Sequence, residues 1–163
     1  LTRGGGQAPT EAVVIRLMKS YAHPGGVYIY RITWRGRSLV YATDTEGYVG
    51  SDRRLAAFAK GADLLIHDAQ YSEADYAQKQ GFGHSTPQMA CELASAAGVK
   101  QLALFHHDPN YDDESVHDLE EQAQGLFKNS FAAREGLAVE LLAQKKPVLT
   151  EQRLRVEAVA LAM

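Results

Sequence analysis

The stretch GHSTPQMACELASAAGVKQLALFHHDP, residues 83–109, decides the fold of this chain. It contains a helix whose two ends are both marked. Thr86 is a favourable N-cap, Pro87 suits the first helical position, and Gly98 ends the helix. The apolar run 101–105 follows at once and predicts a strand buried on both faces. A helix that leads directly into a buried strand indicates a layered α/β arrangement.

The same alternation extends to either side of this stretch. Residues 52–60 and 72–79 are helix-prone, and residues 113–133 carry apolar side chains at helical spacing. The first of these ends at Gly61 and the second begins after Ser72, a suitable N-cap. Short strands are predicted at 63–67 and 137–142, because both runs are short and apolar.

The N-terminal part of the chain reads differently, as consecutive strands. Residues 13–18, 27–33 and 38–42 are rich in β-branched, aromatic and other apolar side chains. The sequence HPGG at 23–26 predicts a turn between the first two strands, and residues 35–37 separate the second from the third. A β-meander followed by alternating helices and strands predicts an α/β (α+β) layered fold.

Composition sets the broad class of protein. The chain has 163 residues, enough for one domain with a sizeable core, and a formal net charge of −3, which gives no sign of a nucleic-acid-coating or membrane-surface protein. Its single cysteine, Cys91, allows no intrachain disulfide, which suits a cytoplasmic protein. The apolar runs are too short to span a bilayer. Residues 1–11 are interpreted as a linker or cut edge, and residues 145–163 as a C-terminal tail.

Polar residues with metal-binding side chains lie mostly just after the predicted strands. Asp44, Asp68 and His106 each follow a strand, His23 lies in the turn, and His84 precedes the Thr86 helix. Strand ends are where sites form in α/β sheets, and imidazole and carboxylate suit zinc, manganese or iron. Taken singly, each residue has an ordinary interpretation as a turn, cap or surface residue. Their number and order favour a site.

Four motifs in this order resemble the second half of the metallo-β-lactamase superfamily, in its phosphodiesterase and RNase Z-like branch. They are HPGG with the following YRI, LVYATDTEG, DLLIHDAQY, and the stretch quoted first. The resemblance covers about residues 12–142. It implies that residues 12–144 form the C-terminal half of an αββα sandwich.

The resemblance also implies a set of metal ligands. His23 matches a histidine that binds one metal, Asp44 matches the aspartate that bridges two metals, and His106 matches a histidine of the second metal. The implied cofactors are two divalent ions, either zinc or manganese, with iron as a further option. One carboxylate can offer an oxygen to each of two cations and offsets their repulsion.

The implied catalytic pair is His84 and Asp68. His84 matches a histidine that acts on the leaving group, and Asp68 stands where the family has glutamate. Aspartate is one methylene shorter, so whether it reaches His84 is a question for the structure. His67 and His107 are predicted to be supporting or structural, because neighbours along a strand point in opposite directions. His117 is predicted to lie on a helix surface.

The superfamily's signature His-x-His-x-Asp-His, which supplies four further ligands, is absent from these 163 residues. The chain is therefore expected to need the N-terminal half of the fold, as a preceding segment or as a second chain, and to be inactive alone. A homodimer is another possible assembly. The competing interpretations are a fragment of a longer enzyme, one half of a two-chain enzyme, and an inactive domain.

The predicted activity is metal-dependent hydrolysis of a small phosphodiester such as a cyclic nucleotide, by a metal-bridging hydroxide with His84 assisting the leaving group. Nucleic acid is less favoured as a partner, because RNase Z enzymes commonly carry a substrate-binding arm between the residues matched by His23 and Asp44. Only 21 positions separate these two residues here. Lactone or thioester hydrolysis stays open. The alternative of a different class is a non-catalytic interaction module, which would bind no metal.

Overall fold

The computed structural model describes residues 12–48, 50–142 and 153–157. Its strands are β1 (Val14–Ser20), β2 (Val27–Trp34), β3 (Arg37–Ala42), β4 (Leu64–Asp68), β5 (Leu102–Phe105), β6 (Ser130–Ala132), β7 (Ala138–Leu142) and β8 (Arg153–Glu157). Its helices are α1 (Arg53–Ala59), α2 (Glu73–Lys79), α3 (Pro87–Ala97) and α4 (Asp113–Leu126).

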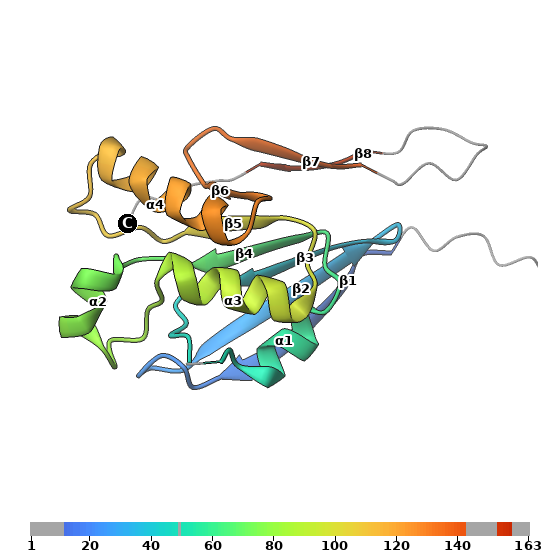
Figure 1. Ribbon diagram of the computed structural model, residues 1–163. Coiled ribbons are helices and arrows are strands. Elements are labelled where there is room, and N and C mark those ends of the chain that lie inside the picture. Colours follow the sequence, from blue (N-terminus) through green and yellow to red (C-terminus); the bar gives the residue numbers. More distant parts are fainter. Residues whose placement is uncertain (1–11, 49, 143–152, 158–163) are drawn as a thin grey trace, which may run out of the picture.

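Six strands form one mixed sheet in the order β1-β2-β3-β4-β5-β6. The first three strands are the predicted antiparallel meander, and β3 to β6 are parallel to one another. Strands β7 and β8 pair as a separate hairpin. Figure 1 shows α1 and α3 lying along one face of the sheet. The predicted layered α/β fold is confirmed.

The helix ends follow the sequence signals. The Ser72 hydroxyl accepts a hydrogen bond from the Asp75 amide at the start of α2, and the Thr86 hydroxyl accepts one from the Met89 amide at the start of α3. Gly98 ends α3 in the left-handed conformation, with φ of 61°. This conformation is readily available to glycine and strained for most other residues.

The predicted helix over 113–133 is too long. Helix α4 ends at Leu126, and residues 130–132 form β6, the edge strand beside β5. The apolar spacing continues past Leu126, and for this reason the sequence periodicity predicts a helix that is too long. Ser130 and Ala132 are buried in this strand, and the amide of Ala132 donates to the Glu120 carboxylate of α4. Sheet pairing and burial therefore override the helical pattern.

The face of the sheet toward the helices carries the main core. Ala42, His67, Leu104 and Ala132 are register partners across β3 to β6, and all four are buried. Small alanines of α3, such as Ala90, let this helix approach the sheet closely. The larger residues of this core come mainly from the strands, so the position of the strand ends is set by dense packing on this side.

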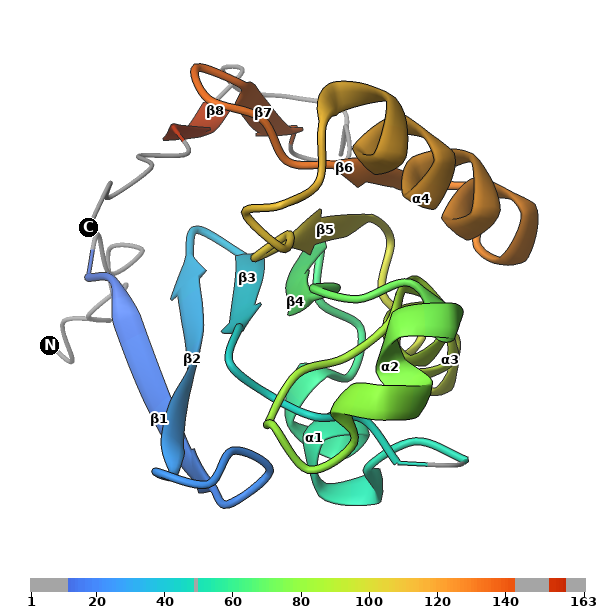
Figure 2. The same ribbon diagram turned by 90° about the vertical axis from the view of Figure 1, so that its left-hand side faces the viewer.

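The opposite face of the sheet is only partly covered. Leu17, Tyr30, Tyr41, Ile66 and Ala103 are register partners across β1 to β5. Their exposed fractions are 59% for Leu17, 37% for Tyr30 and 36% for Tyr41, but only 3% for Ala103. Figure 2 shows the reason, because the β7–β8 hairpin lies on the side of the sheet away from α1, α2 and α3 and near β5 and β6 rather than β1. We call the uncovered part, formed by Ile15, Leu17, Tyr28, Tyr30 and Tyr41, the open face.

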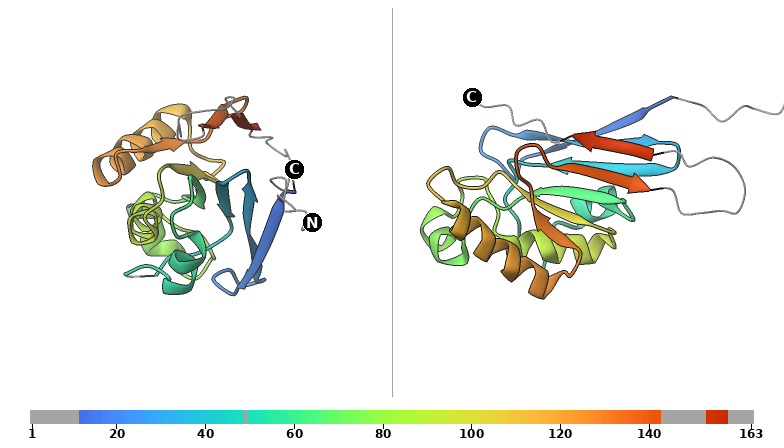
Figure 3. Two further views of the ribbon diagram at one scale, coloured as in Figure 1. Left: turned by 90° about the vertical axis from the view of Figure 1, so that its right-hand side faces the viewer. Right: turned by 90° about the horizontal axis from the view of Figure 1, so that it is seen from above.

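The ends of the chain are described only in part. The predicted linker over residues 1–11 lies outside the described residues. Of the predicted tail, residues 153–157 form β8, and the rest lies outside the described residues as well. Figure 3 shows from above how the β7–β8 hairpin runs beside the main sheet. None of the helices in the described ranges has the length and apolar character needed to cross a membrane.

The open face predicts self-association of this 163-residue chain. Replacing Leu17 and Tyr30 by lysine should weaken association at least about tenfold, because each copy then buries charge instead of apolar surface. Sedimentation equilibrium measures the effect. Leu126→Lys is the control, since Leu126 on α4 has the same 59% exposure as Leu17. A monomeric wild-type chain at the same concentrations would contradict the prediction.

Candidate metal centre

Four strands deliver the candidate residues to one edge of the sheet. Strand β1 is antiparallel to β2, β2 is antiparallel to β3, and β3 to β5 are parallel, so β1, β3, β4 and β5 all run in one direction. Their carboxyl ends therefore lie along the same edge. The predicted residues that follow or end them are His23, Asp44, Asp68 and His106. His84 comes to this edge from the loop before α3.

The backbone departs from the extended strand conformation at Asp44, after β3, and at His106, after β5. Both adopt the left-handed conformation, with φ of 52° for Asp44 and 65° for His106. Such a backbone is uncommon for residues other than glycine, although aspartate and histidine adopt it more readily than most, and examples cluster at functional sites. It brings the Asp44 Oδ1 atom within 3.3 Å of His106 Nε2. The Thr43 hydroxyl donates to the other carboxylate oxygen, Oδ2, at 3.1 Å.

Asp68 is fully buried and organises the second half of the site. Its Oδ2 atom lies 2.8 Å from His84 Nδ1, so the shorter side chain does reach the histidine. Its Oδ1 atom accepts hydrogen bonds from the amides of Ser85 at 3.0 Å and Gln70 at 3.2 Å. The hydrogen bond from Asp68 raises the pKa of His84, although burial acts in the opposite direction.

The rings of His84 and His106 are stacked, with centroids 4.9 Å apart and an interplanar angle of 9°. Gln70 Nε2 lies 3.1 Å from His106 Nδ1, and rotation of the side-chain amide by half a turn would place its oxygen there instead. If the amide presents its oxygen, Nδ1–H donates to it and the Nε2 lone pair faces Asp44. This is the tautomer that a metal ligand needs.

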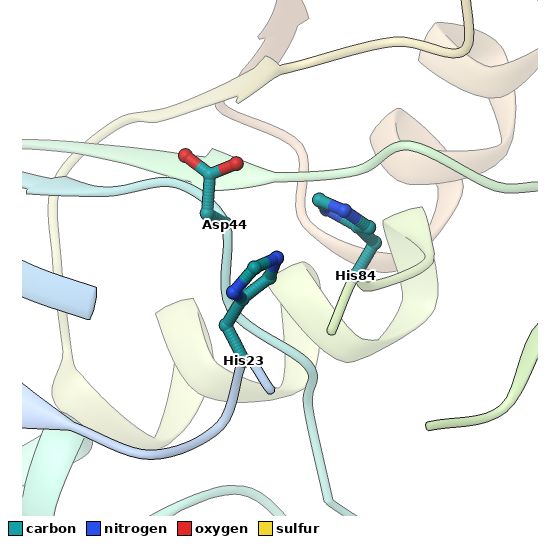
Figure 4. Close-up of side chains that lie close together, drawn as sticks. All are labelled: His23, Asp44 and His84. Atoms are coloured by element: carbon teal, nitrogen blue, oxygen red, sulfur yellow. The ribbon is translucent and has the colours of Figure 1, made fainter. Parts of the chain in front are cut away.

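These residues fit a divalent metal ion by geometry and by chemistry. His23, Asp44 and His84 offer ligand atoms that all lie within 4.8 Å of one another, and so do Asp68, His84 and His106. Figure 4 shows the side chains of His23, Asp44 and His84 gathered around one space. Imidazole nitrogen with carboxylate oxygen is a donor set suited to zinc or manganese. Asp44 shares the first group with His23 and lies 3.3 Å from His106 Nε2, and His84 belongs to both groups.

Three other histidines lie outside this cluster. His67 points into the helix-side core, where burial lowers its pKa and its Nδ1 atom lies 2.7 Å from the Asp68 carbonyl. Burial also lowers the pKa of His107. Neither histidine belongs to a candidate ligand group among the described residues. His117 is exposed on α4, near Glu120 and Glu121.

Two residues important for this geometry escaped the sequence analysis. Glu46 accepts hydrogen bonds from the amides of Gly81 at 2.7 Å and Gly83 at 3.0 Å, and thereby holds the loop that carries His84. Gly83 lies against the ring of His23, because a Cβ atom there would come within 2.4 Å of His23 Cδ2. Glu46 had no local signal, since its partners lie more than 30 positions away. Gly83 could have been noticed from its place beside His84.

The chain belongs to a known superfamily. Residues 5–107 match the family described as the β-lactamase superfamily domain, which covers more than half of the chain. The predicted superfamily is therefore confirmed, and the described structure is an α/β part of the metallo-β-lactamase fold.

Its curated relatives include ribonuclease Z proteins. That of Gemmatimonas aurantiaca is 41% identical over 107 residues, which are 66% of this chain and 32% of that protein. That of Brevibacillus brevis is 42% identical over 96 residues, which are 56% of this chain and 29% of that protein. The chain thus spans about a third of the length of these relatives.

Solved structures agree on the fold. The metallo-β-lactamase fold protein YhfI from Bacillus subtilis matches with a TM-score of 0.60 and 26% identity, over 81% of this chain and 48% of that chain. The short form of human tRNase Z matches with a TM-score of 0.56 and 22% identity, over 78% of this chain and 42% of that chain. Less than half of each of these structures corresponds to the present chain.

Replacing Gly83 by alanine should displace His23 and weaken zinc binding by at least tenfold, because second contacts that orient a ligand are worth about 10- to 100-fold in affinity. Zinc titration measures the change in affinity, with the expected N-terminal half of the fold supplied to every variant. Gly81→Ala is the control, since both glycines have positive φ but a Cβ atom at Gly81 meets nothing within 4 Å. Equal losses in the two variants would show that backbone strain, and not the contact with His23, is responsible.

Proposed function

We propose that this chain is the C-terminal half of a binuclear metal-dependent phosphodiesterase. The observation that carries the proposal is the position of Asp44, whose carboxylate is turned out of β3 toward His106 Nε2 while it also groups with His23. A carboxylate within reach of two histidines suits a bridge between two cations. Such cations, when bound, supply Lewis acidity toward the phosphoryl oxygens and activate the attacking water.

The side chains of this chain would then assist departure of the leaving group. As water attacks phosphorus, the bond to the leaving oxygen breaks and this oxygen takes up a proton. Asp68 engages Nδ1 of His84 and leaves Nε2 as the proton donor. The buried carboxylate holds the ring in one orientation and tautomer, and it stabilises the protonated form before transfer.

The first candidate substrate is a small phosphodiester, and the second is the 3′ end of a tRNA precursor. The second is favoured by the ribonuclease Z relatives. The small phosphodiester is favoured by the connection between β2 and β3. This connection is only two residues long, which leaves no room for an arm between His23 and Asp44. Turnover of a cyclic nucleotide and of a precursor tRNA with a 3′ trailer, compared at equal enzyme concentration, separates the two.

We further propose that the missing N-terminal half of the fold packs on the open face. The face presents Leu17, Tyr30 and Tyr41 in one row across β1, β2 and β3. An exposed apolar patch of this kind marks a surface that is buried in an assembly. The site edge adjoins this face, so the added half can bring its own ligands next to Asp44.

Asp44→Ala should abolish both metal binding and turnover of the complete protein. The substitution removes the carboxylate that separates the two proposed metal sites. Bound zinc or manganese is measured by elemental analysis, and turnover with bis(p-nitrophenyl) phosphate. Asp118→Ala, at an exposed position of α4, serves as the control. Full metal content in Asp44→Ala would exclude Asp44 as a ligand, and an inert wild-type protein would exclude the phosphodiesterase.

His84→Gln should slow cleavage in a manner that depends on the leaving group. A nucleoside leaving group needs a proton, so its release should slow by about 10²–10⁴-fold. The p-nitrophenolate ion leaves without a proton and should be affected far less. Rates for a dinucleotide and for bis(p-nitrophenyl) phosphate give the comparison, with His117→Gln as control. Equal slowing of the two substrates would assign His84 to metal binding instead.

A further inference from the structure

A cleft beside His23 is not used by the proposed mechanism. It has a volume of about 320 Å³ and lies between the β1–β2 turn, the segment after β3, and the end of α2. Its lining includes His23 itself, together with Tyr21, Glu46, Tyr48 and Tyr76. Because His23 is both a predicted metal ligand and part of the lining, the cleft adjoins the proposed metal centre.

Three tyrosines, Tyr21, Tyr48 and Tyr76, line this cleft. The side chains of Tyr21 and Tyr48 are 74% and 54% exposed, although both rings are largely apolar. Lys19 Nζ lies 5.0 Å from the ring centroid of Tyr21, so this ring already takes part in a cation–π contact. Aromatic rings that flank a hollow are suited to stacking a flat π-system.

Tyr76 and Glu46 form the polar part of the cleft. The Tyr76 hydroxyl donates to Glu46 Oε1 at 2.7 Å, and burial together with this hydrogen bond raises the pKa of Tyr76 to about 12. The amides of Gly81 and Gly83 take up two more of the roughly four acceptor positions of this carboxylate. One acceptor position on Glu46 is left by these three donors, and it suits an amino group.

We propose that this cleft is a nucleobase subsite, in which the base next to the scissile phosphate stacks on Tyr21 and Tyr48 and donates its amino group to Glu46. The subsite rests on the proposed phosphodiesterase function and narrows its substrate class to nucleotides with an amino-bearing base. The negative charge of Glu46 disfavours a phosphate here, so the phosphate lies on the Asp44 side of His23. Stacking on an aromatic side chain is sequence-tolerant, and the acceptor adds the preference among bases.

Binding without turnover tests the subsite separately from the activity. Adenosine 5′-monophosphate should perturb the NMR signals of Tyr21, Tyr48 and Tyr76 in the zinc-loaded protein, while ribose 5-phosphate should not. Inosine 5′-monophosphate, which has a carbonyl in place of the amino group, should bind about tenfold more weakly, since a carboxylate cannot accept from it there. Equal perturbation by ribose 5-phosphate, or no perturbation by the nucleotide, would overturn the proposal.

Measurements of turnover provide a second test of the nucleobase subsite. Tyr21→Leu and Tyr48→Leu should each lower kcat/KM for a dinucleotide by about 5- to 100-fold, the usual effect of removing a stacking side chain, and leave its abasic counterpart unchanged. Leu126→Ala, at an exposed position of α4, is the control. Equal losses on both substrates would overturn the subsite. A wild-type protein that cleaves neither substrate defeats the phosphodiesterase instead, and the binding experiment then still decides about the cleft.

Discussion

The buried carboxylate of Asp68 is the constraint on which the rest of the site depends. It ends the largely buried strand β4, and it accepts hydrogen bonds from His84, Ser85 and Gln70. A fully buried carboxylate is costly unless such donors surround it. The three contacts therefore join the strand to the loop before α3 and orient the ring of His84. Gln70 in turn lies against His106, so both histidines depend on the same anchor.

A second layer of support comes from residues that touch neither proposed metal site. Ser85 donates to the Thr45 carbonyl at 2.6 Å and accepts from the Gly47 amide at 2.9 Å, which fixes the segment after Asp44 to the loop that carries His84. Glu46 fixes the other side of this loop. The five predicted residues thus stand on elements that are locked to one another, as a site needs when its geometry is set before substrate arrives.

Much of the fold and of the candidate site is predictable from the sequence, and the predictions that fail do so for physical reasons. The N-caps at Ser72 and Thr86 and the stop at Gly98 are local signals, and the helices they bound were predicted well. The sequence predicts too long a helix at α4, because the apolar spacing of this helix continues into residues that pair with β5. The five site residues were predicted by order and strand-end position, and the structure brings them together. Their roles as ligands and proton donor remain predictions. Glu46 and Gln70 act through partners distant in sequence, which no local pattern reveals.

The structure also explains why half of a fold keeps a recognisable site. Strands β1, β3, β4 and β5 end together because of the sheet topology alone, so the residues after them meet without the second half. The open face marks where that half is proposed to pack. Its contribution would be further ligands and burial of apolar surface.

The central claim is that Asp44 bridges two metal ions in the complete protein. The most direct measurement is the anomalous scattering of zinc in crystals of the full-length protein. The account predicts two peaks about 3.5–4 Å apart, one on either side of the Asp44 carboxylate, with His23 near one and His106 near the other. A single peak remote from Asp44, or zinc bound with Asp44 turned away, would contradict it.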